Sequence, residues 1–445
     1  MKNEPKIEVG IMAQPQIEFR LNGEFNATDG LKLDAGSYSA SIENSRVVIS
    51  TSAGKIFSAD AFYLAPQEKK VLFELKGVTI GVDFHWEQKE NQQFEGALKL
   101  IPEDGKVRAI NIIHLEDYLK SVISSEMSAT SSPDLLKAHA VISRSWLLAQ
   151  IEKTKSLKSG GGLYQTSHET GDEIIRWYDR EDHKNFDVCA DDHCQRYQGI
   201  TKIYSEKALS AVEETRGEVL MFENKICDAR FSKCCGGVSE NFENVWEPVR
   251  HRYLTEVVDS EFGDTTCVDL RQEDEADLWI RNKPHAFCNT TDQKILSQVL
   301  PDFDQKTTDF YRWKVEYSQK ELAELIKKRS GIDFGEIVKL EPVKRGHSSR
   351  LIKLKIIGTK KTLTVGKELE IRKWLSESHL YSSAFVVDHL EVKNGIPQKF
   401  VFTGAGWGHG VGLCQIGAAV MGEKGYSYRE ILAHYFRDAV LEKGY

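Results

Sequence analysis

Glu126 is the residue of this sequence whose type and position best fit acid–base chemistry. It follows Leu119, Val122 and Ile123 and precedes Met127, apolar residues that recur at three- and four-residue steps and predict one face of a helix. At about 100° per residue Glu126 falls within that apolar stripe. Burial there would raise the pKa of the carboxyl toward that of a general acid. The alternatives are that Glu126 ends the helix by turning outward, or pairs with a buried cation for structure.

Arg144 is the second candidate, on a helix that opens at Ser132-Pro133-Asp134 with a serine N-cap and a proline in the first turn. Residues 138–148 are apolar almost all round, which predicts a buried helix. A guanidinium in that company needs an anionic or multiply accepting partner. The spacing favours a structural pair with an internal carboxylate, and the alternative is an arginine that reaches an active site or a substrate.

The segment 404–417 is rich in glycine, reading Gly-Ala-Gly-Trp-Gly-His-Gly-Val-Gly-Leu-Cys-Gln-Ile-Gly. Glycines such as Gly408 let the backbone approach a ligand or adopt positive φ. His409 and Gln415 supply hydrogen-bonding side chains, and Trp407 offers a surface on which a sugar ring stacks. The segment is not a phosphate-binding loop, because no Lys-Ser or Lys-Thr pair follows its glycines at the spacing that such a loop needs. The structural alternative is a tightly packed glycine-rich strand, and the two interpretations are compatible.

A fourth cluster resembles a metal site: His183, Cys189, His193 and Cys194. Two imidazoles and two thiolates suit tetrahedral zinc, although the spacing is not that of a standard finger. Adjacent His193 and Cys194 can share a metal only in an irregular loop, which the surrounding aspartates favour. A Cys189–Cys194 disulfide or free thiols are the alternatives. The chain has eight cysteines, and a second crowded group lies at Cys227, Cys234 and Cys235.

The elements that position these residues predict a mixed α+β fold. Period-two alternation and turn signals over residues 7–113 indicate strands, with Asn22-Gly23 as a hairpin cue and Pro102-Glu103-Asp104-Gly105 as a turn between two strands. Helices are expected at 117–127, 133–153, 319–328 and 427–436, the last with a Ser427/Glu430 capping box, and strands at 352–357 and 363–365. We predict a β-rich amino-terminal region at 1–95, a helical catalytic core with additional strands at 96–260 and 380–445, a metal-bearing insertion at 164–200 and an accessory α/β region at 261–379.

Composition excludes several classes of protein. The 445 residues are 40% hydrophobic and 28% charged, as in a folded, soluble protein of several domains. The net charge of −8 argues against nucleic-acid binding. The sequence contains no apolar run of about 18 residues, so no membrane span is predicted. No apolar segment of signal-peptide length follows Met1, which leaves a cytoplasmic location open.

Four ordered blocks resemble the stage II sporulation protein D and amidase enhancer family. They are Tyr118-Leu119-x-x-Val122-x-x-x-Glu126-Met127, Ala138-His139-Ala140-Val141-Ile142-Ser143-Arg144-Ser145, Phe231-Ser232-Lys233-Cys234-Cys235-Gly236-Gly237 with Glu240-Asn241 and Val245-Trp246, and Gly406-Trp407-Gly408-His409-Gly410-Val411-Gly412 with Gln415. The sequence departs from the family pattern at Ser128, where proline is usual, and at Cys234-Cys235 and Leu413-Cys414.

The resemblance implies a lytic transglycosylase that acts on peptidoglycan glycan strands, in the cell envelope. Glu126 matches the family's catalytic glutamate, which would protonate the glycosidic oxygen leaving N-acetylmuramic acid and then, as base, close a 1,6-anhydro ring. An ordinary glycosidase needs a second carboxylate, and the sequence offers no clear partner. Arg144 aligns with an arginine of the active-site groove, and the Cys/His cluster with a metal-bearing insertion, for which structural zinc is expected.

Two alternatives belong to other functional classes. A non-catalytic member would bind glycan and enhance a separate N-acetylmuramoyl-L-alanine amidase. A metal-dependent hydrolase would centre its chemistry on the Cys/His cluster and leave Glu126 dispensable.

Overall fold

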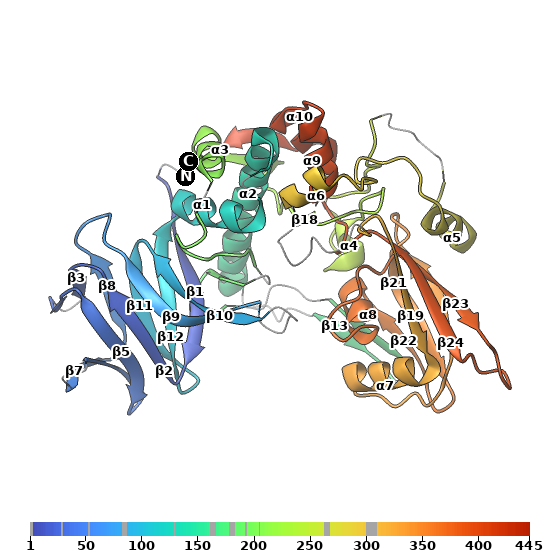
Figure 1. The fold of residues 1–445 in the computed structure, drawn as a ribbon, viewed down its shortest axis with the longest axis horizontal. Helices are drawn as coiled ribbons and strands as arrows, with labels where there is room; N and C mark the ends of the chain where they lie inside the picture. The colour runs from blue at the N-terminus through green and yellow to red at the C-terminus, as the bar shows by residue number, and fades with distance from the viewer. Residues whose placement is uncertain are drawn as a thin grey trace. The chain divides into compact units, whose positions relative to one another are not determined.

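The computed structural model describes residues 3–27, 30–51, 54–81, 87–128, 130–160, 166–177, 183–191, 194–203, 205–261, 268–299 and 309–445. The chain divides into two compact units. Unit 1 comprises Met1–Ala129, Asp182–Glu218 and Lys443–Tyr445, and unit 2 comprises Thr130–Glu181 and Val219–Glu442. The predicted α+β class is confirmed, since sheets and helices both contribute to each unit (Figure 1).

Two sheets form the body of unit 1. One has the order β15 (Val188–Cys189), β1 (Lys6–Gln14), β12 (Lys106–His114), β11 (Ala97–Glu103), β8 (Phe62–Pro66), β3 (Phe25–Ala27) and β4 (Lys32–Leu33). The other has the order β10 (Gln88–Phe94), β9 (Phe73–Ile80), β2 (Gln16–Leu21), β5 (Gly36–Glu43), β6 (Arg46–Thr51) and β7 (Gly54–Ala59). Phe25 and Phe73 meet between the sheets, with ring centroids 6.5 Å apart. The alternation predicted from sequence therefore buries one face of each sheet.

The hairpin expected at Asn22-Gly23 is wrong. The strands on either side of it, β2 and β3, lie in different sheets, because β2 pairs with β5 and β9 whereas β3 pairs with β4 and β8. Asn22 and Gly23 carry the chain from one sheet to the other, since the apolar side chains of β2 and β3 are both needed in the core between them. The expected turn at Asp104-Gly105 does join a hairpin, β11 to β12.

Helix α1 (Leu115–Glu126) follows β12 directly and packs against α3 (Glu206–Glu214). The predicted stripe is confirmed, since Leu119, Val122 and Ile123 are fully buried. The last long strand of the β-rich part of unit 1 thus leads directly into the helix that carries Glu126.

Unit 2 contains a helical part and an α/β part. In the helical part α2 (Pro133–Gly160), α6 (Gln293–Val299), α9 (Gln415–Glu423) and α10 (Tyr428–Tyr435) pack on one another. Ser132 Oγ accepts a bond from the N–H of Leu135 at 3.3 Å, as expected of the helix cap, and the Ser427/Glu430 capping box is present. Short strands accompany them: β16 (Glu218–Phe222), β17 (Lys225–Ile226), β26 (Val440–Lys443), β18 (Phe231–Ser232) and β25 (Leu413–Cys414).

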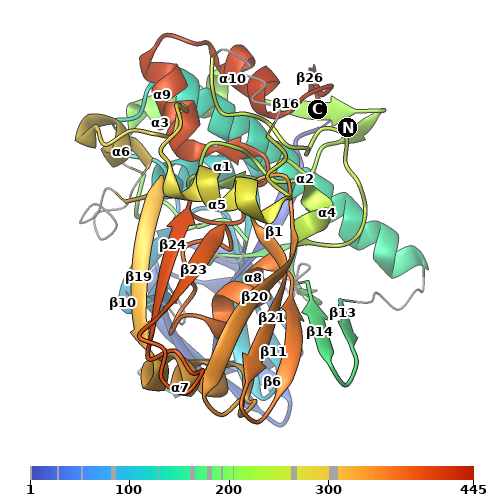
Figure 2. The same cartoon turned by 90° about the vertical axis from the view of Figure 1, so that its right-hand side faces the viewer.

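The α/β part is built from a five-stranded and a three-stranded sheet. The first has the order β13 (Ser167–Glu169), β14 (Glu173–Arg176), β22 (Thr362–Gly366), β21 (Leu351–Gly358) and β20 (Ile337–Arg345). The second has the order β19 (Arg312–Ser318), β24 (Lys399–Ala405) and β23 (Phe385–Leu390). Helices α5 (Glu273–Arg281), α7 (Gln319–Ser330) and α8 (Glu368–Trp374) lie against these strands, with α5 across β23 and β24 (Figure 2), and α4 (Phe242–Val245) lies against α8.

One hydrophobic core unites the α/β part. It includes Trp313 of β19, Ile326 of α7, Leu354 of β21 and Phe402 of β24. The predicted accessory region therefore shares its core with strands that the sequence analysis assigned to the catalytic core, while the predicted domain division itself stays a prediction. Within the described residues, none of the helices combines the length and apolarity that crossing a bilayer requires.

Candidate functional site

Glu126 is the last residue of α1 and is half-buried, less enclosed than the apolar stripe that precedes it. Its Oε1 accepts a hydrogen bond of 3.1 Å from the backbone N–H of Arg196. The helix end thus lets the carboxylate leave the apolar face and contact another segment of unit 1. The carboxylate is held in position but is not sealed from water.

The segment Cys194–Gln198 lies along α1 and provides that contact. The backbone N–H of Gln198 donates to Ser121 Oγ at 3.2 Å, and Tyr118 Oη donates to Gln195 Oε1 at 3.4 Å. Tyr197 stacks on Tyr118 with ring centroids 5.0 Å apart and donates to Asn111 Oδ1 of β12 at 2.5 Å. Burial raises the pKa of both phenols well above 10, so they stay neutral donors. The segment is therefore anchored residue by residue on the helix that carries Glu126.

The same segment begins in the predicted metal cluster. His183, Cys189 and Cys194 have ligand atoms that all lie within 4.8 Å of one another, and His183 Nε2 is 3.4 Å from Cys194 Sγ. His193, the fourth predicted ligand, lies outside the described residues. Nearby Cys194 and Cys189 thiols add to the burial that raises the pKa of Tyr118, which places the cluster close to α1. Three residues of the types that zinc prefers thus converge next to the anchored segment.

The glycine-rich segment lies in unit 2 and is fixed by backbone pairing and by one arginine. Trp407 and Cys234 exchange two backbone hydrogen bonds of 2.8 and 3.0 Å, and the N–H of Gly408 donates to Tyr381 O at 2.8 Å. Arg350, fully buried, donates to Gly408 O at 3.2 Å and to Cys235 O at 3.0 Å. Nothing in the sequence around Arg350 indicates this role, because the carbonyl groups to which it donates lie far from it in the chain.

Trp407 is half-buried in an aromatic group. Its ring centroid lies 4.6 Å from that of Phe310 and 4.3 Å from that of Tyr381, with both pairs tilted. These contacts hold the indole in one orientation while part of it stays accessible. An indole fixed in this way can stack on a sugar ring.

His409 is held as a neutral imidazole. Its Nδ1 accepts from the N–H of Val411 at 3.0 Å, and its ring contacts Trp246 edge to face at 4.8 Å. Burial, with Arg230 and Arg350 nearby, lowers the pKa of His409 well below its ordinary value. In this state the ring orders the glycine-rich segment and does not act as a cation.

Gln415 is buried and bonded inside unit 2. Its Nε2 donates to His139 Nε2 at 3.1 Å, and the opposite nitrogen of that ring, Nδ1, lies 3.2 Å from Ser143 Oγ. This pattern places the imidazole proton on Nδ1. Burial lowers the pKa of His139 to about 3, so the ring is neutral near pH 7. Gln415 thereby ties the start of α9 to α2.

Arg144 lies on α2 with none of its side chain exposed. This burial agrees with the structural interpretation of its place among apolar residues. Glu126 belongs to unit 1, and Arg144 and the glycine-rich segment belong to unit 2. Within unit 1, Glu126 contacts the segment that begins at Cys194 of the Cys/His cluster. Within unit 2, Trp407 pairs with Cys234 and Gln415 bonds to His139.

Glu240 is a second residue that sequence reasoning did not place in the site. It is fully buried, and its carboxylate accepts from the backbone N–H groups of His347 and Ser348, both at 3.1 Å, and from Ser348 Oγ at 2.6 Å. Its own N–H donates to Gly410 O at 2.8 Å. The signal in the sequence is its position just after the glycine pair of the third family-like block.

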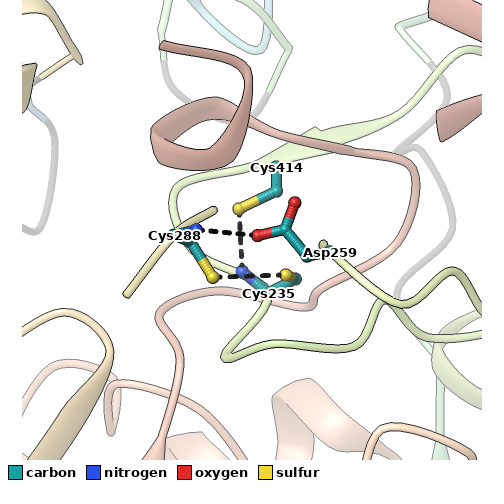
Figure 3. Close-up of side chains that lie close together, drawn as sticks. All are labelled: Cys235, Asp259, Cys288 and Cys414. Carbon is teal, nitrogen blue, oxygen red and sulfur yellow. Dashed lines mark hydrogen bonds between the residues drawn. The ribbon is translucent and has the colours of Figure 1, made fainter. Parts of the chain in front are cut away.

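A further cluster of possible metal ligands is fully buried in unit 2. It consists of Cys235, Asp259, Cys288 and Cys414, whose ligand atoms all lie within 4.8 Å of one another (Figure 3). Cys235 belongs to a crowded group of cysteines in the sequence, but no spacing connects that group to Cys288 and Cys414. Only the folded chain brings these residues together.

Comparison with known proteins relates the chain to two family models. Residues 103–222 match the model described as Stage II sporulation protein, and residues 240–412 match a model described as a domain of unknown function. An uncharacterized protein of Brachyspira hyodysenteriae is 26% identical over 349 residues, which cover 77% of this chain and 71% of that protein.

Two named relatives come from Bacillus. Stage II sporulation protein D of Bacillus amyloliquefaciens is 25% identical over 331 residues, which cover 74% of each chain. The amidase enhancer of Bacillus subtilis (strain 168) is 24% identical over 330 residues, which cover 73% of this chain and 40% of the enhancer. Glu126 lies within the residues matched by the sporulation protein model.

Proposed function

This chain belongs to the family of stage II sporulation protein D and the amidase enhancer, and on that premise we propose that it is a peptidoglycan lytic transglycosylase with Glu126 as its catalytic acid and base. The family gives it a role in the cell wall. The substrate we propose is the glycan strand, cut between N-acetylmuramic acid and N-acetylglucosamine.

The proposed reaction needs one carboxyl group. Glu126 donates its proton to the glycosidic oxygen as the bond to C1 of N-acetylmuramic acid breaks. The resulting carboxylate then takes the proton of the C6 hydroxyl of the same sugar as that oxygen bonds to C1. The ring closes as a 1,6-anhydro sugar, the proton returns to Glu126, and no water is consumed.

The observation that carries the proposal is the fixed position of Glu126 at the end of α1. Its carboxylate is bonded to the Arg196 N–H and yet is half-buried rather than sealed, as a group that must meet a substrate requires.

The other predicted residues take supporting roles in this proposal. We assign Trp407 to stacking on a sugar ring, and Gly408 and His409 to the backbone shape of the glycan-binding segment. Gln415 and Arg144, both buried, act as positioning residues. We assign structural zinc to His183, Cys189, His193 and Cys194, where it would hold the segment that contacts Glu126. The chemistry itself needs no metal.

Mass spectrometry of products from denuded glycan strands tests the reaction. The wild-type protein should release fragments with an anhydromuramyl end, one water lighter than hydrolysis products. Glu126→Gln should lower the rate by about 10²–10⁴-fold, since it removes general acid–base catalysis, while glycan binding persists. Asp117→Asn is the matched control, because Asp117 lies on the same helix and pairs with Lys120 at 2.9 Å.

Hydrated ends would contradict the anhydro reaction, and full activity of Glu126→Gln would exclude this residue as the acid. Activity that depends on zinc but not on Glu126 would favour the metal-dependent hydrolase.

The second candidate function is enhancement of an amidase, favoured by the relative of that name. In that case the chain binds glycan without cutting it and raises the rate of an added N-acetylmuramoyl-L-alanine amidase. Glu126→Gln would then leave the enhancement unchanged, whereas Trp407→Ala would weaken glycan binding and enhancement together.

A further inference from the structure

We propose that Cys235, Asp259, Cys288 and Cys414 form a mononuclear zinc site in unit 2, separate from the Cys/His cluster of unit 1. All four residues are at most 2% exposed. Their side chains converge on one point from different parts of the fold, as Figure 3 shows. The proposal does not depend on the transglycosylase reaction.

The spacing of the ligand atoms fits one metal ion. In a tetrahedral zinc site with Zn–S bonds of about 2.3 Å, neighbouring sulfurs lie about 3.8 Å apart. Cys235 Sγ and Cys288 Sγ are 3.6 Å apart, and all four ligand atoms fit within 4.8 Å. A disulfide would require about 2.0 Å between the sulfurs. The thiols are therefore placed as ligands of a shared ion and not as a bonded pair.

The groups around the ligands orient them in the way that metal sites require. The N–H of Cys235 donates to Cys414 Sγ at 3.2 Å. Asp259 accepts from Tyr435 Oη at 2.6 Å through Oδ1 and from the N–H of Cys288 at 2.9 Å through Oδ2. Such bonds fix the orientation of thiolate and carboxylate ligands and leave lone pairs for the metal.

The buried charge of Asp259 independently favours a bound cation. A fully buried carboxylate beside three thiols is costly unless a cation accompanies it. Among the described residues, the ion-pair partner of Asp259 is one imidazole, that of His434 at 4.0 Å, with no lysine or arginine. A divalent ion bound by thiolates and a carboxylate supplies the missing positive charge. Thiolate donors in a closed tetrahedral set favour zinc over magnesium or calcium.

The ion would be structural, because four protein ligands leave no open coordination position. Cys235 follows β18, Cys288 lies between α5 and α6, and Cys414 ends β25 and is the residue directly before α9. Cys414 also lies within the glycine-rich segment, close to its carboxyl-terminal end. Zinc at this point would cross-link segments distant in the sequence and hold the carboxyl-terminal end of that segment.

Two neighbouring cysteines help to define the ligand set. Cys234 precedes Cys235 in the sequence and is fully buried, yet it is not part of the group that converges within 4.8 Å. Cys227 is as deeply buried in the same unit and lies outside the cluster. Cys227→Ser is therefore a matched control for the loss of a buried thiol.

The test uses the full chain with Cys189→Ser and Cys194→Ser, which removes the thiols of the other cluster. The protein is loaded with Zn²⁺, passed over a chelating resin and assayed for zinc by elemental analysis. We expect one zinc per chain, lost in Cys288→Ser and retained in Cys227→Ser and Cys234→Ser. Loss of zinc in Cys234→Ser with retention in Asp259→Asn would overturn the carboxylate ligand.

Cobalt gives a readout that does not depend on how well the serine variants fold. Co²⁺ added to the same Cys189→Ser/Cys194→Ser chain should produce thiolate-to-metal charge-transfer absorption. Asp259→Asn should shift the visible bands of the ion while keeping that absorption. Absence of the charge-transfer band, equal zinc loss in Cys227→Ser, or a Cys235–Cys288 disulfide in peptide mapping would each overturn the site.

Discussion

Individual buried groups decide how the glycine-rich segment is held. Arg350 donates to carbonyl groups on both sides of the paired backbones of Trp407 and Cys234, and one of its bonds reaches Ser348 Oγ at 2.9 Å. Gly410 packs directly on its guanidinium. A Cβ at Gly410 would lie 2.4 Å from Arg350 Cζ, and its φ is +78°. Glycine is thus required there for space as well as for conformation.

Gly410→Ala should lower the free energy of unfolding by about 1–3 kcal/mol more than a control alanine substitution at a glycine that has positive φ but no close neighbour. Gly395→Ala is that control, because Gly395 has φ of +80° and open space around it. It should cost about 1 kcal/mol. Urea unfolding of both variants measures the difference. Equal losses would show that Arg350 moves aside without cost.

His139 should make stability depend on pH. Its pKa is about 3 in the folded protein because of burial, against 6.5 for an ordinary histidine. Between these two pKa values the histidine is protonated in the unfolded chain but neutral in the folded chain. The contribution of His139 to stability is therefore fully present above pH 6.5 and is lost as pH falls toward 3. Between these values the free energy of unfolding should rise by about 1.4 kcal/mol per pH unit from this residue.

His139→Gln should remove that part of the slope when urea unfolding is measured from pH 6 to pH 4. Ser143→Ala, which alters the same hydrogen-bonded group without removing the titrating ring, should keep the slope while lowering stability. An unchanged slope in His139→Gln would show that other groups carry the dependence.

At the scale of elements, the position of Glu126 depends on the segment Cys194–Gln198 and not on α1 alone. The N-cap residue of the helix, His114, makes no side-chain cap bond, and the helix ends at the catalytic candidate itself. Backbone N–H groups of the segment bond to Ser121 and Glu126, and Tyr197 ties it to β12 through Asn111. A strand, a helix and an irregular segment together hold one carboxylate.

Tyr197→Phe should destabilise the protein by about 1–3 kcal/mol, because Asn111 Oδ1 loses its buried donor. Tyr118→Phe is the matched control from the same ring pair, since its bond to Gln195 is 3.4 Å long, and it should cost less than about 1 kcal/mol. Urea unfolding compares the two. A greater loss in Tyr118→Phe would show that the stacking, and not the bond to β12, anchors the segment.

At the scale of the whole molecule, the two units are interleaved along the chain. Unit 1 takes up Lys443–Tyr445 although the preceding residues belong to unit 2. Within unit 1, Gly444 N–H donates to Gly217 O at 2.8 Å and Tyr445 Oη donates to Glu116 Oε1 of α1. The last residues of the chain thereby support the helix that carries Glu126.

Tyr445→Phe should speed hydrogen exchange at α1 amides about fivefold, because loss of one hydrogen bond costs about 1 kcal/mol, and should leave α7 unchanged. Tyr317→Phe is the matched variant in unit 2, where Tyr317 Oη donates to Leu375 O at 2.9 Å. It should speed exchange at α7 and leave α1 unchanged. Equal effects of either variant on both helices would show that the units open together.

The sequence alone determined the features that local periodicity and caps dictate. The apolar stripe before Glu126, the buried helix of Arg144, the Ser427/Glu430 capping box and the hairpin at Asp104-Gly105 all follow from residues a few positions apart. The family was also evident, because its motifs are short and local.

Tertiary structure decided what depends on residues distant in the chain. The two sheets separated β2 from β3 despite the turn signal between them, since burial of both strands outweighed local pairing. The bond from Arg196 to Glu126, the guanidinium of Arg350 behind Gly410, and the meeting of Asp259 with Cys414 have no spacing by which a sequence could reveal them. Such contacts arise only when packing of the core brings their segments together.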